Sequence, residues 1–148
     1  MNTRIAFNRQ RGIVMLDALV AIVIFSIGII GMITLQSQAV NMASAAKYRT
    51  DAAMLADQVI AQMWASDTAT AGALATNFAS PDGAAYKKWA TNVTTITQLG
   101  SLPGASANPP TISVDANNNV TVTVFWKAPS ETAQQPLHQY IATTQIQP

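Results

Sequence analysis

The hydrophobic pattern divides the chain into segments with different periods. An unbroken apolar run extends from Ile13 to Leu35, and apolar residues then recur with helical spacing as far as about Ser66. The last third of the chain alternates apolar and polar residues with a period of two, which is typical of β-strands. This order predicts an α+β fold, in which one long N-terminal helix packs on a small antiparallel sheet.

The predicted helix covers residues 13–66, because no proline lies between Met1 and Ser80 to break it. Residues 13–35 would form ~35 Å of helix, enough to cross the ~30 Å hydrocarbon core of a bilayer. Residues 36–66 are predicted to be amphipathic. The expected buried face consists of Ala52, Leu55, Val59 and Met63, widened by Ile60 and Trp64, with Met54 as additional core filler.

Short elements are predicted after this helix. Residues 67–79 are small and polar and indicate a loop, and Ser80-Pro81-Asp82 is typical of a helix start. Leu102-Pro103-Gly104 ends the predicted helix. Its expected apolar face consists of Tyr86, Trp89, Ala90, Val93 and Ile96.

The alternating segments predict a hairpin and a third strand. Ile112 and Val114 alternate with polar residues, as do Val120, Val122, Val124 and Trp126, and Asn117-Asn118-Asn119 between them favours a turn. Leu137 to Ile146 is the predicted third strand. Trp64, Trp89 and Trp126 are interpreted as core residues that join the helices to the sheet.

One charge interrupts the apolar run. Asp17 stands early in the segment, directly after a leader that carries Arg4, Arg9 and Arg11. A carboxylate inside a membrane span costs about 3 kcal/mol on insertion scales, so Asp17 is a candidate functional residue. The arginines before the span favour a cytoplasmic N-terminus.

Two simpler membrane signals compete with this interpretation. A secretory signal peptide also has a basic start and an apolar core, and Ala43-Ser44-Ala45 matches its small-residue cleavage pattern. Against it, the apolar run exceeds the usual ~7–15 residues, and Asp17 lies inside it. A plain signal anchor is the other alternative.

The junction Gly12-Ile13, with Asp17 at the fifth position after it, resembles the class III signal of type IV pilins and type II secretion pseudopilins. The resemblance implies that prepilin peptidase cleaves after Gly12 and that the new N-terminal Ile13 is N-methylated. It also implies that Asp17 pairs with the N-terminal amine of a neighbouring subunit. Compared with the commonest form, Gly-Phe-Thr-Leu-Ile-Glu, aliphatic Ile13 replaces Phe, and Asp17 replaces Glu with an arm one methylene shorter.

Residues after the N-terminal helix make the resemblance more specific, to one group of minor pilins. Trp89, then Leu102-Pro103-Gly104, then the strand Val120 to Trp126 are similar to minor pilins called type IV pilus modification proteins (PilV-like). This implies a leader at 1–12, a transmembrane half-helix at 13–35, an amphipathic half at 36–66 and a periplasmic globular region at 67–148.

The implied function is that of a minor pilin in the complex that initiates pilus assembly. It would be anchored in the bacterial inner membrane and later incorporated into the pilus. The implied partners are prepilin peptidase, other minor pilins, the major pilin, the inner-membrane assembly machinery and, before assembly, membrane lipid. A type II secretion pseudopilin (GspI-like) and a pilus-tip adhesin are the alternatives.

No residue pattern suggests catalysis, so we expect neither an enzyme nor a cofactor. His138, the single histidine, is interpreted as a surface or half-buried strand residue. Asp115 to Asn119 mimics the start of an EF-hand loop, but Val120 and Trp126 stand where Gly and Glu are required, so no metal site is expected. Cysteine is absent, and the net charge of +1 suggests no nucleic-acid partner.

Overall fold

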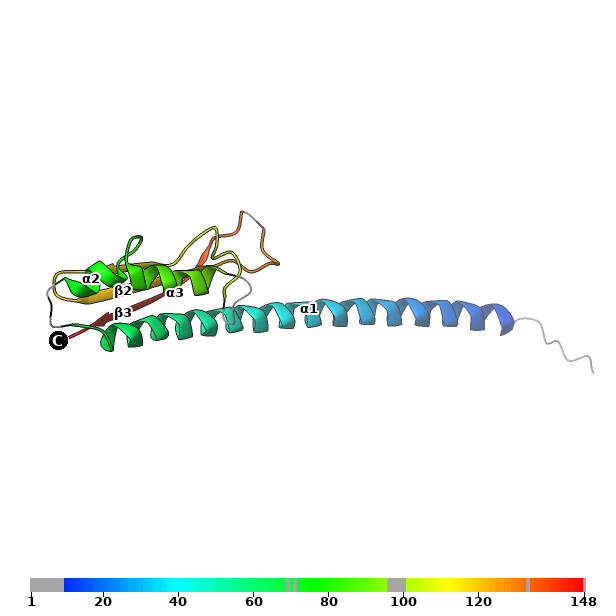
Figure 1. Ribbon diagram of the computed structural model, residues 1–148. Coiled ribbons are helices and arrows are strands. Elements are labelled where there is room, and N and C mark those ends of the chain that lie inside the picture. The colour runs from blue at the N-terminus through cyan, green and yellow to red at the C-terminus, as the bar shows by residue number, and fades with distance from the viewer. Residues whose placement is uncertain (1–9, 69, 71, 96–100, 133, 148) are drawn as a thin grey trace, which may run out of the picture. The chain divides into compact units, whose positions relative to one another are not determined.

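The computed structural model describes residues 10–68, 70, 72–95, 101–132 and 134–147, and has the predicted α+β layout (Figure 1). Most of the leader, with Arg4 and Arg9, lies outside these residues, as does Ile96. The chain divides into an N-terminal unit, residues 1–42, and a C-terminal unit, residues 43–148. The elements are α1 (Gln10–Trp64), α2 (Ala73–Phe78), α3 (Ala84–Thr94), β1 (Thr111–Val114), β2 (Asn119–Trp126) and β3 (His138–Gln145).

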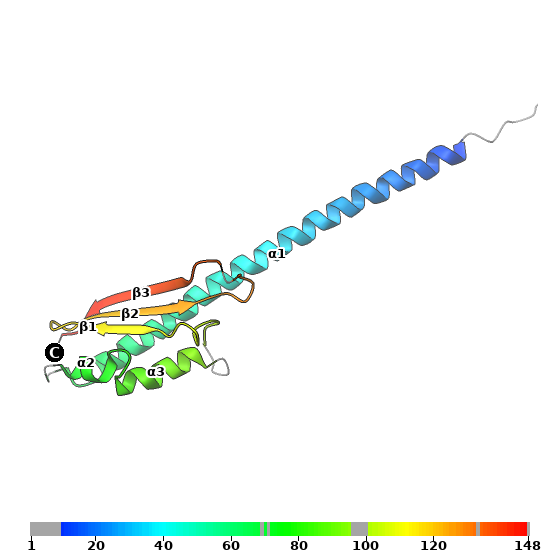
Figure 2. The same cartoon turned by 90° about the horizontal axis from the view of Figure 1, so that it is seen from above.

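The strands form one antiparallel sheet in the order β1-β2-β3 (Figure 2). The β1–β2 hairpin is confirmed, with Val114 opposite Val120. Its turn is held by the Asp115 carboxylate, whose Oδ1 accepts the backbone N–H groups of Asn117 and Asn119, each at 2.8 Å. The hydrogen bond from the Asn119 side chain to the same carboxylate is the main cause that lowers the pKa of Asp115, and the two backbone bonds add to it. The predicted third strand is also confirmed, as β3.

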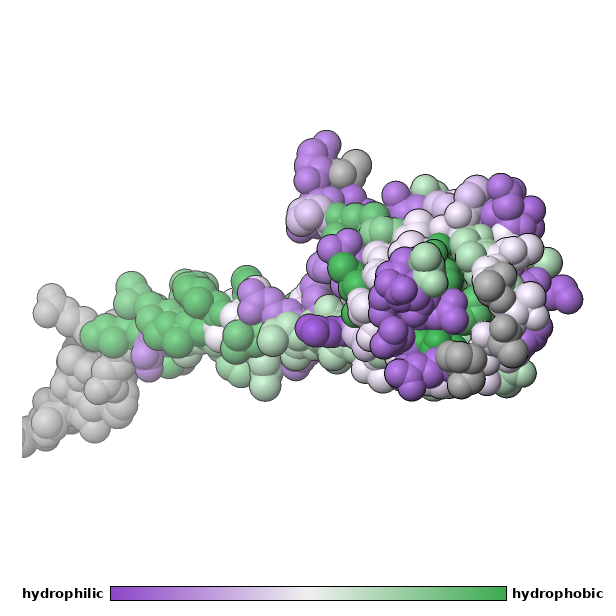
Figure 3. All heavy atoms as spheres, turned by 90° about the vertical axis from the view of Figure 1, so that its left-hand side faces the viewer, coloured by the Kyte–Doolittle hydropathy of each residue, from purple (hydrophilic) through white to green (hydrophobic). Residues whose placement is uncertain are grey.

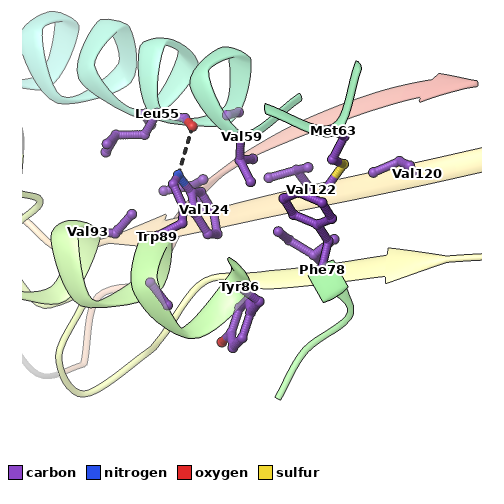
Figure 4. Close-up of a cluster of buried hydrophobic side chains, with 14 of the residues drawn as sticks. Leu55, Val59, Met63, Phe78, Tyr86, Trp89, Val93, Val120, Val122 and Val124 are labelled. Atoms are coloured by element: carbon purple, nitrogen blue, oxygen red, sulfur yellow. Dashed lines mark hydrogen bonds between the residues drawn. The ribbon is translucent and has the colours of Figure 1, made fainter. Parts of the chain in front are cut away.

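The core of the C-terminal unit lies on one face of the sheet, where all three helices contribute side chains (Figure 4). Along β2 every second residue is buried, as its alternating sequence predicts. Fully burying a side chain of valine or methionine size contributes about 1.5–3 kcal/mol. The helices contribute Ala52, Leu55, Ala56, Val59, Met63, Leu74, Phe78, Tyr86, Trp89, Ala90 and Val93, and the strands contribute Ile112, Val120, Val122, Val124 and Trp126.

Two aromatic residues of α3 connect this core to the backbone of other elements. The Trp89 indole Nε1 donates to the Leu55 carbonyl of α1 at 3.0 Å, as Figure 4 shows. The Tyr86 hydroxyl donates to the Pro110 carbonyl, just before β1, at 2.7 Å. Burial raises the pKa of Tyr86. Both rings therefore bury their apolar bodies and satisfy their polar atoms.

Two predicted core residues of α1 are exposed instead. Trp64 is 50% exposed and Met54 is 65% exposed, whereas Met63 is completely buried. The face that packs is centred on Ala52, Ala56 and Met63, and Trp64 is rotated ~100° past Met63 at the last residue of the helix. The prediction that Trp64 joins helix to sheet is wrong, whereas Trp89 and Trp126 are buried as predicted.

The loop predicted at residues 67–79 is wrong in part, because α2 lies within it. Leu74 and Phe78 are spaced four residues apart and are both buried, so tertiary packing stabilises a helix that the small polar composition conceals. Gly72 precedes it in the left-handed conformation, with φ of 78°.

The predicted helix start at Ser80-Pro81-Asp82 is also wrong, because α3 begins at Ala84 after Gly83. A Cβ at Gly83 would collide with the Asn77 carbonyl, so this turn requires glycine. Ser80 contacts β1 instead of capping the helix. Its backbone N–H donates to the Ile112 carbonyl at 3.0 Å, and the Ile112 N–H donates to its hydroxyl at 3.2 Å.

We expect a chain beginning at Ala43 to fold, because every residue of the buried core follows it. In that chain Met63→Ala should lower the free energy of unfolding by about 2–5 kcal/mol through lost burial and an internal cavity. Met54→Ala, the matched control on the exposed face, should change it by less than about 0.5 kcal/mol. Urea unfolding followed by tryptophan fluorescence measures both, and equal effects would contradict the assignment of the buried face.

Candidate functional site

The segment Ile13–Leu35 exposes its apolar side chains around the whole circumference of α1. None of its residues is buried, and the helix is long and apolar enough to cross a membrane. Figure 3 shows the hydrophobic surface of this part of α1 in green. A continuous apolar surface of this kind is covered by lipid or by other helices in functional proteins.

The polar side chains of this segment are Asp17, Ser26 and Thr34, and two of them bond to their own helix. The Ser26 hydroxyl donates to the Ile22 carbonyl at 2.7 Å, and the Thr34 hydroxyl donates to the Ile30 carbonyl at 3.0 Å. Such bonds satisfy a hydroxyl within an apolar surrounding.

Asp17 differs, since it is exposed and forms no hydrogen bond or ion pair within the described residues. Its carboxylate is therefore the unsatisfied polar group of the apolar segment. A partner from outside this part of the chain is required wherever water is excluded.

The Gly12–Ile13 peptide bond lies in the first turn of α1, which begins at Gln10. The first four N–H groups of a helix have no intrahelical acceptor, so unwinding this turn breaks few hydrogen bonds. Gly12 is also a poor helix former, by about 1 kcal/mol relative to Ala. The bond is therefore placed where a protease can bind it in extended form at low energetic cost.

Gly28 and Gly31 lie in the same segment, and no contact with another described part of the chain explains their place in the helix. A Cβ added at either position would meet nothing within 4 Å. Both glycines leave room on the helix surface for close approach of a second helix.

In the C-terminal unit His138 is partly exposed, as predicted, but it has an acidic partner that the sequence reasoning missed. Its Nε2 lies 2.6 Å from Glu131 Oε1, and its ring stacks on Trp126 with the ring centroids 5.6 Å apart. Glu131 also accepts the Ala128 N–H at 3.0 Å and so closes the loop before β3. The hydrogen bond from His138 is the main cause that lowers the pKa of Glu131. The sequence signal that could have predicted this contact is the position of Glu131, seven residues before His138 and on the other side of Pro136.

The remaining polar candidates of the C-terminal unit have structural roles. Asp115 binds the backbone of its own turn, and among the described residues no group of three metal-ligating side chains is found. Trp89 and Trp126 are core residues rather than an exposed stacking surface.

Comparison of the chain with protein-family models, with curated proteins and with solved structures finds no match.

We expect the Glu131–His138 contact to make stability depend on pH in the acid range. Because the folded-state pKa of Glu131 lies below its ordinary value of 4.5, the contact stabilises the fold above about pH 4.5 and is lost as pH falls through the lower folded value. Glu131→Gln should therefore be less stable than wild type at pH 5.5, and the difference should shrink by pH 3. Urea unfolding at both pH values measures it, and a difference independent of pH would contradict the assigned contact.

Proposed function

We propose that this protein is a minor pilin of a bacterial type IV pilus that takes part in initiating filament assembly. The observation that carries the proposal is Asp17, five residues after Gly12, a carboxylate without a partner among the described residues in the fully exposed apolar segment Ile13–Leu35 of α1. The Gly12–Ile13 bond in a weak first turn supports proteolytic release of the leader.

In the first stage the segment 13–35 holds the subunit in the inner membrane. Its length matches the hydrocarbon core, and the arginines of the leader keep the N-terminus in the cytoplasm. The sheet and its covering helices then lie in the periplasm. Prepilin peptidase cleaves after Gly12, and Ile13 becomes the methylated N-terminus.

In the second stage the same apolar surface leaves lipid and packs among the helices of other subunits. Burial of Asp17 without a partner would be costly, whereas pairing with the N-terminal amine of a neighbour offsets much of that cost. The pair thereby sets the axial register between subunits, as single polar groups do in other helix assemblies.

Intact mass of the protein extracted from membranes tests the processing step. We expect the mass of residues 13–148 plus one methyl group. Gly12→Val should block cleavage because its Cβ crowds the extended backbone at the scissile bond. Gly28→Val is the matched control, since a Cβ at that position meets nothing within 4 Å, and it should be cleaved normally. A full-length mass, or cleavage near Ala45, would contradict the pilin assignment.

Asp17 should be needed for assembly and not for insertion. Asp17→Ala removes the lone charge of the span and should ease insertion by up to about 3 kcal/mol. We expect it to accumulate in the inner membrane, to be cleaved after Gly12, and to fail to enter pili. Immunoblots of sheared pili against membranes measure this distribution.

Asp17→Glu is the control for that experiment. It keeps the charge, lengthens the arm toward the neighbouring amine and should retain incorporation. Normal piliation by Asp17→Ala would refute the pairing role.

A further inference from the structure

We propose that the outer edge of β3 binds an extended segment of another protein as an added antiparallel strand. We further propose that an acidic side chain of this segment pairs with Arg49. This edge would select a partner for the C-terminal unit whether or not the protein assembles into a filament.

The register of the sheet identifies which backbone groups face outward. Ile112 lies opposite Val122 and bonds Ser80 on the outer side of β1, so the backbone groups of Val122 face β3. Val122 lies opposite Ala142, and groups alternate along a strand. The backbone groups that point away from the sheet are therefore those of Gln139, Ile141, Thr143 and Gln145.

These outward groups are unoccupied by other parts of the described chain. No described backbone group bonds to them, and the side chains of all four residues are exposed. Figure 2 shows β3 at the margin of the sheet, with no element beyond it. A row of free donors and acceptors with the spacing of a strand is the complement of another extended backbone.

The two edge strands of the sheet differ in how their outer backbone groups are protected. This difference argues that the exposed outer edge of β3 is a binding feature. On β1 the chain itself supplies a closure: Ser80 binds both backbone groups of Ile112, and Pro109 and Pro110 precede the strand. By contrast, β3 is twice as long and pairs with β2 without a bulge over all eight residues. It contains no Lys, Glu, Asp or Pro, the residues that usually protect an edge.

A groove at one end of this edge supplies charge selectivity. It has a volume of about 470 Å³ and lies between α1 and the strand ends, lined by Ala45, Ala46, Arg49, Trp126, His138 and Gln139. Arg49 is exposed and forms no ion pair or hydrogen bond with described residues, whereas Lys47 pairs with Asp51. Glu131, the acid that contacts the groove residue His138, also accepts the Ala128 N–H.

The groove and the outer edge of β3 together indicate which kind of segment binds: an extended one with an acidic side chain. Alternate side chains of an added strand would lie on the α1 side of the sheet, beside Arg49. A carboxylate there gains a charge-assisted hydrogen bond with the guanidinium. A second copy of β3 fits less well, because that strand carries no acid and would leave Arg49 unpaired.

Selection from a displayed library of random ten-residue peptides, against the full chain in detergent micelles, tests the proposal. Enriched peptides should lack proline at alternate positions and carry Asp or Glu at a constant position.

Ile141→Pro should weaken the binding of these peptides by at least about tenfold, because it removes an outward backbone donor and obstructs the added strand. It removes no β2–β3 hydrogen bond, since the Ile141 N–H faces away from β2. Ile141→Thr, which keeps the N–H, is the matched control and should bind within about twofold of wild type.

Arg49→Gln should abolish the difference in affinity between a selected peptide and its Glu→Gln form. N-methylation of the inward backbone nitrogens of that peptide should abolish binding to the wild-type chain, a result independent of how Ile141→Pro folds. Absence of enrichment over empty micelles, or equal binding by a folded Ile141→Pro variant, would overturn the proposal. Dimerisation that Ile141→Pro abolishes, without peptide binding, would assign the edge to a second copy and also overturn it.

Discussion

Burial of one face of α1 against the valines of β2 is the interaction on which the C-terminal unit depends. Ala52 and Ala56 are completely buried and belong to the same hydrophobic cluster as the valines of β2. Val122 and Val124 fill the opposite side of this contact. Close packing of this kind loses stability whenever a side chain is shortened or enlarged, so the contact determines which rotation of α1 the sheet accepts.

The same helix serves two different environments. From Ile13 to Leu35, α1 exposes apolar side chains all round, and none of them is buried by the rest of the described chain. Hydroxyl groups there bond to their own helix, but a carboxylate on the short arm of Asp17 has no described acceptor or donor. In our proposal the cost of the unpaired Asp17 carboxylate is tolerable at the start of the span. Pairing with the amine of a neighbouring subunit offsets this cost and so fixes the position of one subunit against the next.

The N-terminal and C-terminal units thus have different proposed roles. The apolar helix is unspecific in its contacts, because lipid tails and other apolar helices suit it almost equally. In our proposal the edge of β3 is more selective, since binding there requires an extended backbone and an acid within reach of Arg49. A subunit present in an assembly complex needs both properties, one to enter the assembly and one to choose its neighbour.

Sequence alone was sufficient for features that depend on neighbouring residues. The apolar run, the position of Asp17 after Gly12, and the alternation of β2 are local patterns whose period directly reports a helix or a strand. For this reason α1, the hairpin and β3 were predicted to within a few residues.

Features that depend on contacts between distant residues were decided by the tertiary structure. α2 forms because Leu74 and Phe78 are buried in the core. Ser80 does not cap α3 as expected, because it hydrogen-bonds both backbone groups of Ile112, 32 residues later. Trp64 is exposed because the packing of Met63 sets the rotation of the helix. The open edge of β3 is likewise invisible in the sequence, since a strand becomes an edge only through the order in which the strands pair.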